Sequence, residues 1–279
     1  MSVINTNVNA LFAQSAMKTN ARELSHAMQQ LSTGNRINSA GDDAAGLAIT
    51  QSMTAQVRGL NQAVRNANDA VNMLQTAEGS MAEQTNMLQR MRELSVQAAN
   101  GTYSSTQRNY LKSEFDALGS QIDDISANTT WNGKQLLDGT DNTGIGGASG
   151  AFVFQVGQDS GQTITVTIND MSLSGIGASG QDISTASGAS SAIGYIDSAL
   201  DTINAARADI GAGINRLTYA ADNLSNISAN VAASRSTVQD TDYATASTQL
   251  SKAQIIQQAS TAMLAQANQQ PQTVLALLK

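Results

Sequence analysis

The stretch that decides the fold runs from residue 193 to residue 238 and reads IGYIDSALDTINAARADIGAGINRLTYAADNLSNISANVAASRSTV. An apolar residue falls at every seventh position, which is two turns of an α-helix, so one apolar seam runs along one side of a long helix. We expect this helix to span about residues 189–239 and to bury its seam against another apolar surface. The seam residues are Ile196, Ile203, Ile210, Leu217, Leu224, Val231 and Val238.

A matching pattern in the first half of the chain supplies a partner for this seam. We expect a second long helix from about Asp42 to about Asn100, ended by Asn100-Gly101, and a third helix from Thr106 to Ala127. The helices should pack through their apolar stripes, which brings the two ends of the chain together. The stripe residues are Val57, Leu60, Val64, Ala67, Val71, Leu74, Met81 and Leu88 in the second helix, and Leu111, Phe115, Leu118, Ile122 and Ile125 in the third.

A capping motif precedes the second helix. In Ser39-Ala40-Gly41-Asp42, the Ser39 side chain is expected to cap free amides of the first turn, and Asp42 to bind back. Asp42 and Asp43 would also complement the positive end of the helix dipole. Adjacent residues point about 100° apart around a helix, so we interpret these carboxylates as capping groups and not as an acid–base pair.

The centre of the chain changes to a period of two. We expect one β-hairpin over residues 152–168, lying against the helices because an isolated hairpin is marginally stable in water. The turn-rich stretch 128–150 precedes it, with Asn132-Gly133 among its breakers. Residues 173–191 are rich in Gly, Ser and Ala, which predicts a flexible return loop. The apolar residues that alternate are Phe152, Phe154 and Val156, and then Ile164, Val166 and Ile168.

Both ends of the chain predict weak helices. Their apolar stripes are thin and diluted by Ala, Gln and Ser, so such helices draw their stability from packing and should need partners. We expect these helices to mediate packing between subunits. The apolar residues that would carry this packing are Ile4, Val8, Leu11, Leu24, Met28 and Leu31 at the front, and Ile256, Met263, Val274 and Leu277 at the rear.

Composition agrees with a mainly α fold: an elongated antiparallel helical bundle or coiled coil with one small β-hairpin and paired chain termini. Aromatic residues make up only 4% of the 279 residues, and Pro271 is the only proline, which suits long uninterrupted helices. We divide the chain into three parts. They are the terminal helices (1–39 with 240–279), a helical bundle (40–139 with 186–239), and a hairpin with outward loops (140–185).

Several functional classes are disfavoured by the sequence. The net charge is −7 with no basic cluster, so we expect no nucleic-acid binding, and no apolar run is long enough for membrane insertion. The N-terminus lacks the pattern of a cleaved signal peptide. There is no cysteine, and His26 is the only histidine, so we expect no metal site, no cofactor and no enzyme activity. Residues 138–144 have a loose calcium-loop character, but we interpret them as a turn.

Several long motifs resemble those of the bacterial flagellins, and they cover both ends of the chain in the right order. The opening MSVINTNVNAL is similar to the start of that family, and LSTGNRINSAGDDAAG at residues 31–46 is close to its signature run. The other matching runs are 66–70, 131–137, 234–235, 240–244, 264–268 and 271–278. One departure is Thr245-Ala246 after Tyr243-Ala244, where the family often has a glutamate.

The resemblance implies an extracellular structural subunit that polymerises into the flagellar filament for swimming. It implies terminal helices that line the filament channel and are disordered before assembly. The implied partners are copies of the chain itself, the flagellar type III export apparatus with an export chaperone, and the hook-junction and cap proteins. The short middle implies that the large outer domains are absent and the filament is thin. The alternatives are a hook–filament junction protein, a flagellin with an inserted enzyme domain and a cell-surface ligand-binding protein.

One family property maps onto individual residues. The run 89–97, QRMRELSVQ, resembles the patch that the animal flagellin-sensing Toll-like receptor binds, and Glu114 resembles a second contact. The alternative is that Arg90 and Arg92 are ordinary solvated or inter-subunit residues. The patch residues are Gln89, Arg90, Arg92, Glu93, Leu94, Gln97 and Glu114.

Overall fold

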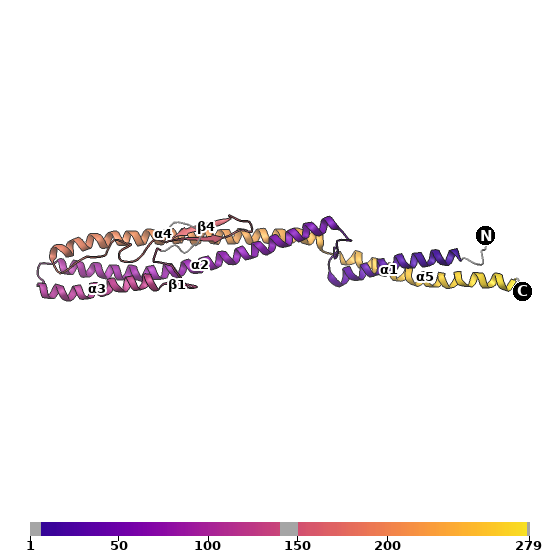
Figure 1. Ribbon diagram of the computed structural model, residues 1–279, viewed down its shortest axis with the longest axis horizontal. Helices are drawn as coiled ribbons and strands as arrows, with labels where there is room; N and C mark the ends of the chain where they lie inside the picture. The colour runs from indigo at the N-terminus through magenta and orange to yellow at the C-terminus, as the bar shows by residue number, and fades with distance from the viewer. Residues whose placement is uncertain (1–6, 140–149, 278–279) are drawn as a thin grey trace. The chain divides into compact units, whose positions relative to one another are not determined.

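The computed structural model describes residues 7–139 and 150–277, and of residues 270–277 it describes only the backbone. The chain is mainly helical, as predicted (Figure 1). Its elements are α1 (Val8–Thr33), α2 (Ala44–Ala99), α3 (Ser105–Asn128), β1 (Thr130–Trp131), β2 (Lys134–Gln135), β3 (Ala151–Gln155), β4 (Thr163–Thr167), α4 (Ala186–Gln239) and α5 (Tyr243–Leu277). They form two units: unit 1 contains Met1–Val57 and Ala229–Lys279, and unit 2 contains Arg58–Ser228.

Unit 2 buries the seams of α2, α3 and α4 in one core. On α4 the heptad residues are inaccessible to solvent as far as Leu217, and Leu224 beyond them is only half-buried. Leu74, Met81 and Leu88 of α2 are equally buried, and α3 contributes Phe115 and Ile122. The predicted packing of these three stripes is therefore confirmed, and burial of apolar surface is what stabilises the unit.

The β3–β4 hairpin is confirmed, and it lies on the helices of unit 2. The strands are antiparallel, with Phe152 opposite Val166 and both side chains buried. A Cβ atom on Gly213 of α4 would lie 2.8 Å from Cγ2 of Val166. Because real Cβ atoms do not approach so closely, the absence of a side chain at Gly213 lets the hairpin rest directly on the helix.

A second, smaller hairpin was not predicted. Strands β1 and β2 pair with Trp131 opposite Lys134. Asn132 and Gly133 connect them with φ values of 50° and 78°, the left-handed conformation that two-residue hairpin turns require. The sequence interpretation treated Asn132-Gly133 only as a breaker, because two-residue strands give no detectable alternation.

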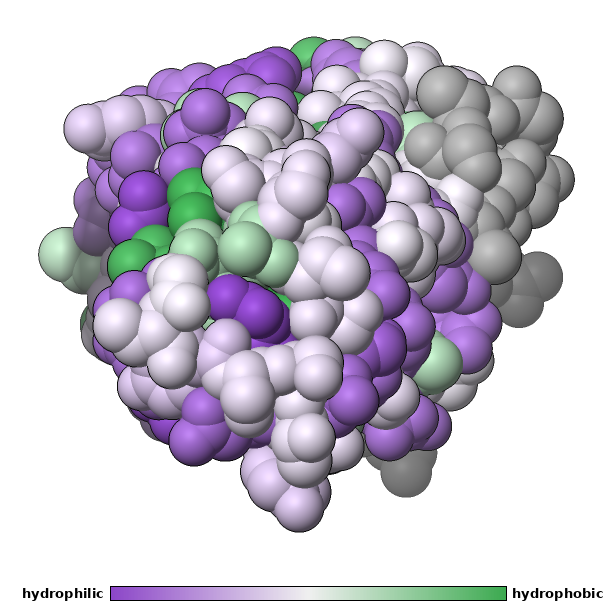
Figure 2. Space-filling view, turned by 90° about the vertical axis from the view of Figure 1, so that its left-hand side faces the viewer, coloured by the Kyte–Doolittle hydropathy of each residue, from purple (hydrophilic) through white to green (hydrophobic). Residues whose placement is uncertain are grey.

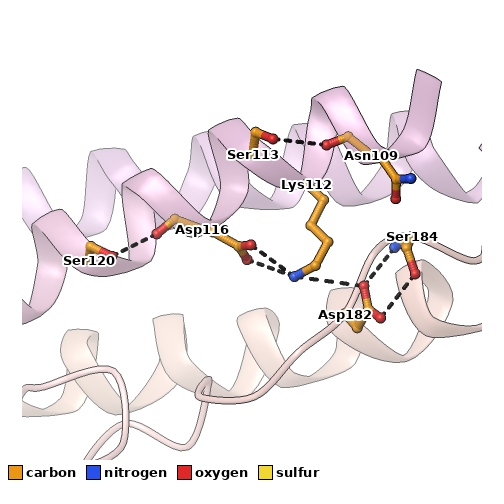
Figure 3. Close-up of polar contacts among 7 residues, drawn as sticks. All are labelled: Asn109, Lys112, Ser113, Asp116, Ser120, Asp182 and Ser184. Atoms are coloured by element: carbon orange, nitrogen blue, oxygen red, sulfur yellow. Dashed lines mark hydrogen bonds and ion pairs between the residues drawn. The ribbon is translucent and has the colours of Figure 1, made fainter. Parts of the chain in front are cut away.

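The return segment before α4 is not the flexible loop that we predicted for residues 173–191. Ile176, Ala178 and Ile183 are buried in the core of unit 2, and α4 already begins at Ala186. Polar contacts hold the segment as well. Lys112 Nζ on α3 lies 2.9 Å from the carboxylate of Asp116 and 3.8 Å from that of Asp182, which also accepts a hydrogen bond from the Ser184 backbone amide at 2.9 Å (Figure 3). The prediction of flexibility was wrong because isolated apolar residues anchor the segment.

Unit 1 contains the antiparallel pair of α1 and α5, which lie side by side in Figure 1. Asn7 caps α1 by accepting from the Ala10 amide at 3.1 Å, and it donates to the Ala267 carbonyl at 2.7 Å. Thirteen residues later, Asn20 donates to the Ala253 carbonyl at 2.8 Å. In both hydrogen-bonded pairs the two residue numbers have nearly the same sum, as they must when two helices run in opposite directions. This sum defines the antiparallel register of α1 and α5. The pairing of the two chain ends is confirmed.

The residue that caps the start of α2 is Asp43 and not the predicted Ser39. Asp43, the residue directly before the helix, accepts from the Gly46 amide at 2.8 Å and is therefore the capping residue. Ser39 lies too far upstream to reach the first turn. The predicted return contact of Asp42 is present, because the Ser39 backbone amide donates to the Asp42 carboxylate at 2.8 Å.

Candidate assembly surfaces

The contact between α1 and α5 buries small and polar residues. Its buried members are Ala27, Ala246 and Ala253, together with Asn20 and Gln30. The side-chain oxygen of Asn20 is buried without a hydrogen-bond partner. The cost of burying it offsets part of the stability that the hydrogen bond from the Asn20 side-chain amide contributes. Because Ala side chains bury little apolar area, this contact alone stabilises the pair weakly.

Several of the larger apolar side chains of the pair are exposed and do not take part in this contact. Phe12 is 72% exposed and Leu11 is 56% exposed. Of the residues predicted for assembly, Leu24 and Leu31 are half-buried, and the exposed ones are Val8, Leu11, Met28, Ile256 and Met263. Ile4 lies outside the described residues, as do the side chains of Val274 and Leu277. Phe12 and Ile255 are exposed apolar residues that the sequence interpretation missed, because each stands beside the stripe and not on it.

A backbone clasp joins the two chain halves within unit 1; we use this name for residues 34–36 and 239–241. The Arg36 amide donates to the Gln239 carbonyl at 2.7 Å, and the Thr241 amide donates to the Gly34 carbonyl at 2.9 Å. Gly34 can serve here because its φ of 72° is the left-handed conformation that ends α1. The clasp therefore fixes where α1 ends and where α5 begins relative to each other.

Asp42 ties the loop after the clasp to α1. Its carboxylate accepts from the backbone amides of Ser39 and Asn38, and it lies 3.1 Å from Nε2 of His26 on α1. The two amide donors are the main reason that the pKa of Asp42 is lowered, because they stabilise the charged carboxylate.

The patch that resembles a receptor site lies on unit 2, and its charges are paired within the chain. Arg90 contacts Glu93 and Glu114, each at 2.9 Å, and Arg92 contacts Asp197 of α4 at 2.6 Å. Hydrogen bonds to these carboxylates raise the pKa of both arginines.

The other patch residues divide between surface and core. Gln89 and Gln97 are exposed, and Gln97 donates to the Tyr103 hydroxyl at 2.8 Å. Leu94 is only 1% exposed and belongs to the core of unit 2, so it does not form part of the surface in this conformation. Helical spacing explains the difference, because Leu94 continues the buried face of Leu88 and Met91.

The nearby end of unit 2, where α2 turns into α3, is mostly hydrophilic or neutral (Figure 2). One group of hydrophobic residues and a few scattered ones interrupt this surface in that view. Within the described part of the chain, no group of three or more His, Cys, Asp or Glu residues could hold a metal ion. No helix in the described ranges is both long and apolar enough to cross a bilayer.

Comparison with known families matches both ends of the chain. Residues 4–142 match the bacterial flagellin N-terminal helical region, and residues 193–278 match the bacterial flagellin C-terminal helical region. This chain belongs to the bacterial flagellin family. The recognition made from the motifs is therefore confirmed, and so is the fold, because the matched regions contain α1, α2, α3 and α5 and most of α4.

Individual flagellins show how much of the chain is shared. It is 43% identical to a flagellin of Halalkalibacterium halodurans over 279 residues, covering 99% of this chain and 100% of the relative. It is 39% identical to the flagellar filament 33 kDa core protein of Treponema phagedenis over 285 residues, covering 99% and 100%. The match to flagellin A of Vibrio anguillarum, at 34% identity, extends over 375 positions. This chain of 279 residues is therefore a short flagellin, as predicted.

Solved structures agree with this assignment. The crystal structure of Bacillus cereus flagellin has a TM-score of 0.51 and 32% identity, covering 57% of this chain and 88% of that one. A putative flagellar hook-associated protein from Vibrio parahaemolyticus has a TM-score of 0.59 at 17% identity, covering 71% and 99%. At that identity the second likeness concerns the fold alone.

Proposed function

We propose that this chain is the repeating structural subunit of an extracellular flagellar filament, and that copies assemble through the α1–α5 pair. The observation that carries the proposal is the combination of full-length similarity to flagellins with large apolar side chains exposed on that pair. The family is structural, and we assign the chain no catalytic role. In this proposal, residues 1–39 and 240–279 line the channel, and the bundle of residues 40–139 and 186–239 surrounds them.

The physical driving force is burial of the outward apolar residues between copies. An isolated helical pair with an alanine-rich contact gains little from its own packing. Covering Leu11, Phe12 and Met263 with neighbouring subunits would remove their apolar surface from water. The same contacts would then stabilise both the filament and the terminal helices.

The other partners follow from family membership. We propose export through the flagellar type III apparatus with an export chaperone, followed by assembly between hook-junction and cap proteins. The exposed residues Gln89, Arg90, Arg92, Glu93, Gln97 and Glu114 are proposed to contact a Toll-like receptor or a neighbouring subunit. Arg90 and Arg92 would have to exchange their present carboxylate partners to do so.

The first test concerns the exposed pair of residues on α1. In the double variant Leu11→Gln with Phe12→Gln, seeded assembly should require a higher subunit concentration, on the order of 100-fold, because two apolar side chains no longer gain from burial. The measurement is elongation of filament fragments, followed by sedimentation and electron microscopy.

The matched control keeps both positions apolar. Leu11→Met with Phe12→Leu should elongate filaments nearly as well as the unmodified chain. Truncation of residues 1–30 or 250–279 should abolish elongation. Normal filaments from the glutamine variant or from either truncation would contradict the proposal. Binding to fragment ends without elongation would instead favour a hook–filament junction protein.

A further inference from the structure

Two methionines of the described ranges are exposed, and both lie in unit 1. Met28 on α1 is 53% exposed and Met263 on α5 is 64% exposed. Every other methionine within the described ranges is buried or half-buried, and Met1 lies outside them. The buried and half-buried methionines are Met17, Met53, Met73, Met81, Met87, Met91 and Met171.

Both exposed thioethers lie on the α1–α5 pair. The register set by Asn7 with Ala267 and by Asn20 with Ala253 places Met263 level with Leu11. The same register places Met28 level with Ala246, farther along the pair. Met263 therefore belongs to the stretch of the pair where Leu11 and Phe12 are also exposed.

We propose that Met28 and Met263 form an oxidation-sensitive site, at which a peroxide converts the thioethers to sulfoxides and weakens assembly of the subunit. The inference rests on the proposed function, because assembly through the α1–α5 pair is what would bury these side chains. The susceptible state is the free subunit, and the filament would protect both residues.

The chemistry needs only a two-electron oxidant such as hydrogen peroxide. The methionine sulfur attacks one peroxide oxygen, the O–O bond breaks and a sulfur–oxygen bond forms. The departing hydroxide takes the proton of the hydroxyl group now bound to sulfur and leaves as water, so sulfur is oxidised by two electrons and peroxide is reduced by two. Methionine sulfoxide reductases reverse the reaction, which makes the modification reversible.

The effect on assembly follows from polarity. A sulfoxide is a polar, chiral group in place of a flexible apolar one. Burying it between subunits without a hydrogen-bond partner is unfavourable, so each sulfoxide should raise the critical concentration for elongation about tenfold. Exposed on the free subunit, the same sulfoxide costs little, and the fold of unit 2 should not change.

The test treats the full-length subunit with hydrogen peroxide, maps sulfoxides by mass spectrometry and measures seeded elongation. We expect oxidation first at Met28 and Met263, a raised critical concentration, and recovery after treatment with methionine sulfoxide reductases. Met28→Leu with Met263→Leu should elongate normally before and after peroxide. Met81→Leu, which changes a core methionine, is the matched control and should remain sensitive to peroxide. Intact filaments should oxidise more slowly at the two sites than free subunits.

Three results would overturn the inference while leaving the proposed function intact. They are preferential oxidation at other methionines, unchanged elongation of the oxidised subunit, and equal loss of elongation by the oxidised double-leucine variant. Equal oxidation rates of Met28 and Met263 in filaments and in free subunits of the unmodified chain would also overturn it. If the untreated chain fails to elongate seeds at all, the proposed function itself fails.

Discussion

Gly213 allows the β3–β4 hairpin to lie directly on α4. A Cβ atom at this position would meet both methyl groups of Val166, at 2.8 Å and 3.4 Å, and Leu74 of α2 at 3.6 Å. Val166 is buried and β-branched, so it cannot turn aside easily. The glycine therefore serves close packing, although glycine within a helix is intrinsically unfavourable.

Gly213→Ala should destabilise the chain by about 1 kcal/mol. Overpacking destabilises by about 1–3 kcal/mol, and the better helix propensity of alanine offsets about 1 kcal/mol of this. The matched control is Gly194→Ala on the same helix, where an added Cβ meets nothing within 4 Å. That variant should be more stable than the unmodified chain. Urea unfolding of the three subunits measures the difference, and a Gly213→Ala variant as stable as Gly194→Ala would disprove the packing role.

At the scale of the element, the loop between α1 and α2 depends on the charge of Asp42. Its pKa is lowered, chiefly by the backbone amides of Ser39 and Asn38. A lowered pKa in the folded state means that the stabilisation is complete above the unfolded value of about 3.9. It is lost as the pH falls through the lower, folded pKa.

The amide signal of Ser39 in an NMR titration should therefore shift with a midpoint below about 3.9. Asp42→Asn should remove this transition and lower the stability of the loop near neutral pH. In acid, where the Asp42 carboxyl is protonated, the loop should be about equally stable in the variant and in the unmodified chain. A midpoint at or above the ordinary aspartate value would show that the amide hydrogen bonds do not hold the carboxylate in its charged form.

Elements with strong periodicity could be predicted from the sequence, and those held by isolated residues could not. The seven-residue spacing from Ile196 to Leu217 predicted α4 correctly, because a continuous seam must be buried along its length. Ile176 and Ile183 stand alone among Gly and Ser, so nothing local indicates that they anchor the return segment in the core. Their burial depends on the core that side chains of α2, α3 and α4 form together.

For the candidate surfaces, the sequence indicates which residues belong to the terminal helices but not which of them are exposed. Helical periodicity identified Leu11 and Met263 as residues of the terminal pair, but it could not show that they point away from the α1–α5 contact. That direction depends on the register, which Asn7 and Asn20 set through hydrogen bonds to distant carbonyls. The motif resemblance likewise located the run 89–97, whereas the burial of Leu94 follows from packing within unit 2.

At the scale of the whole molecule, the two units differ in what stabilises them. Unit 2 has a continuous core of large apolar side chains on three helices, so it should be stable in a free subunit. The α1–α5 pair has an alanine-rich contact and exposes its largest apolar residues. We expect this pair to become stable only when copies of the chain cover those residues.

Hydrogen–deuterium exchange of the free subunit and of the filament tests this claim most directly. In the free subunit, backbone amides of α1 and α5 should exchange much faster than those of α2 and α4 within unit 2, because opening a weakly packed pair costs little free energy. In the filament, α1 and α5 should become strongly protected, while the core of unit 2 changes little. Equal protection of α1 and α5 in the two states would contradict the account.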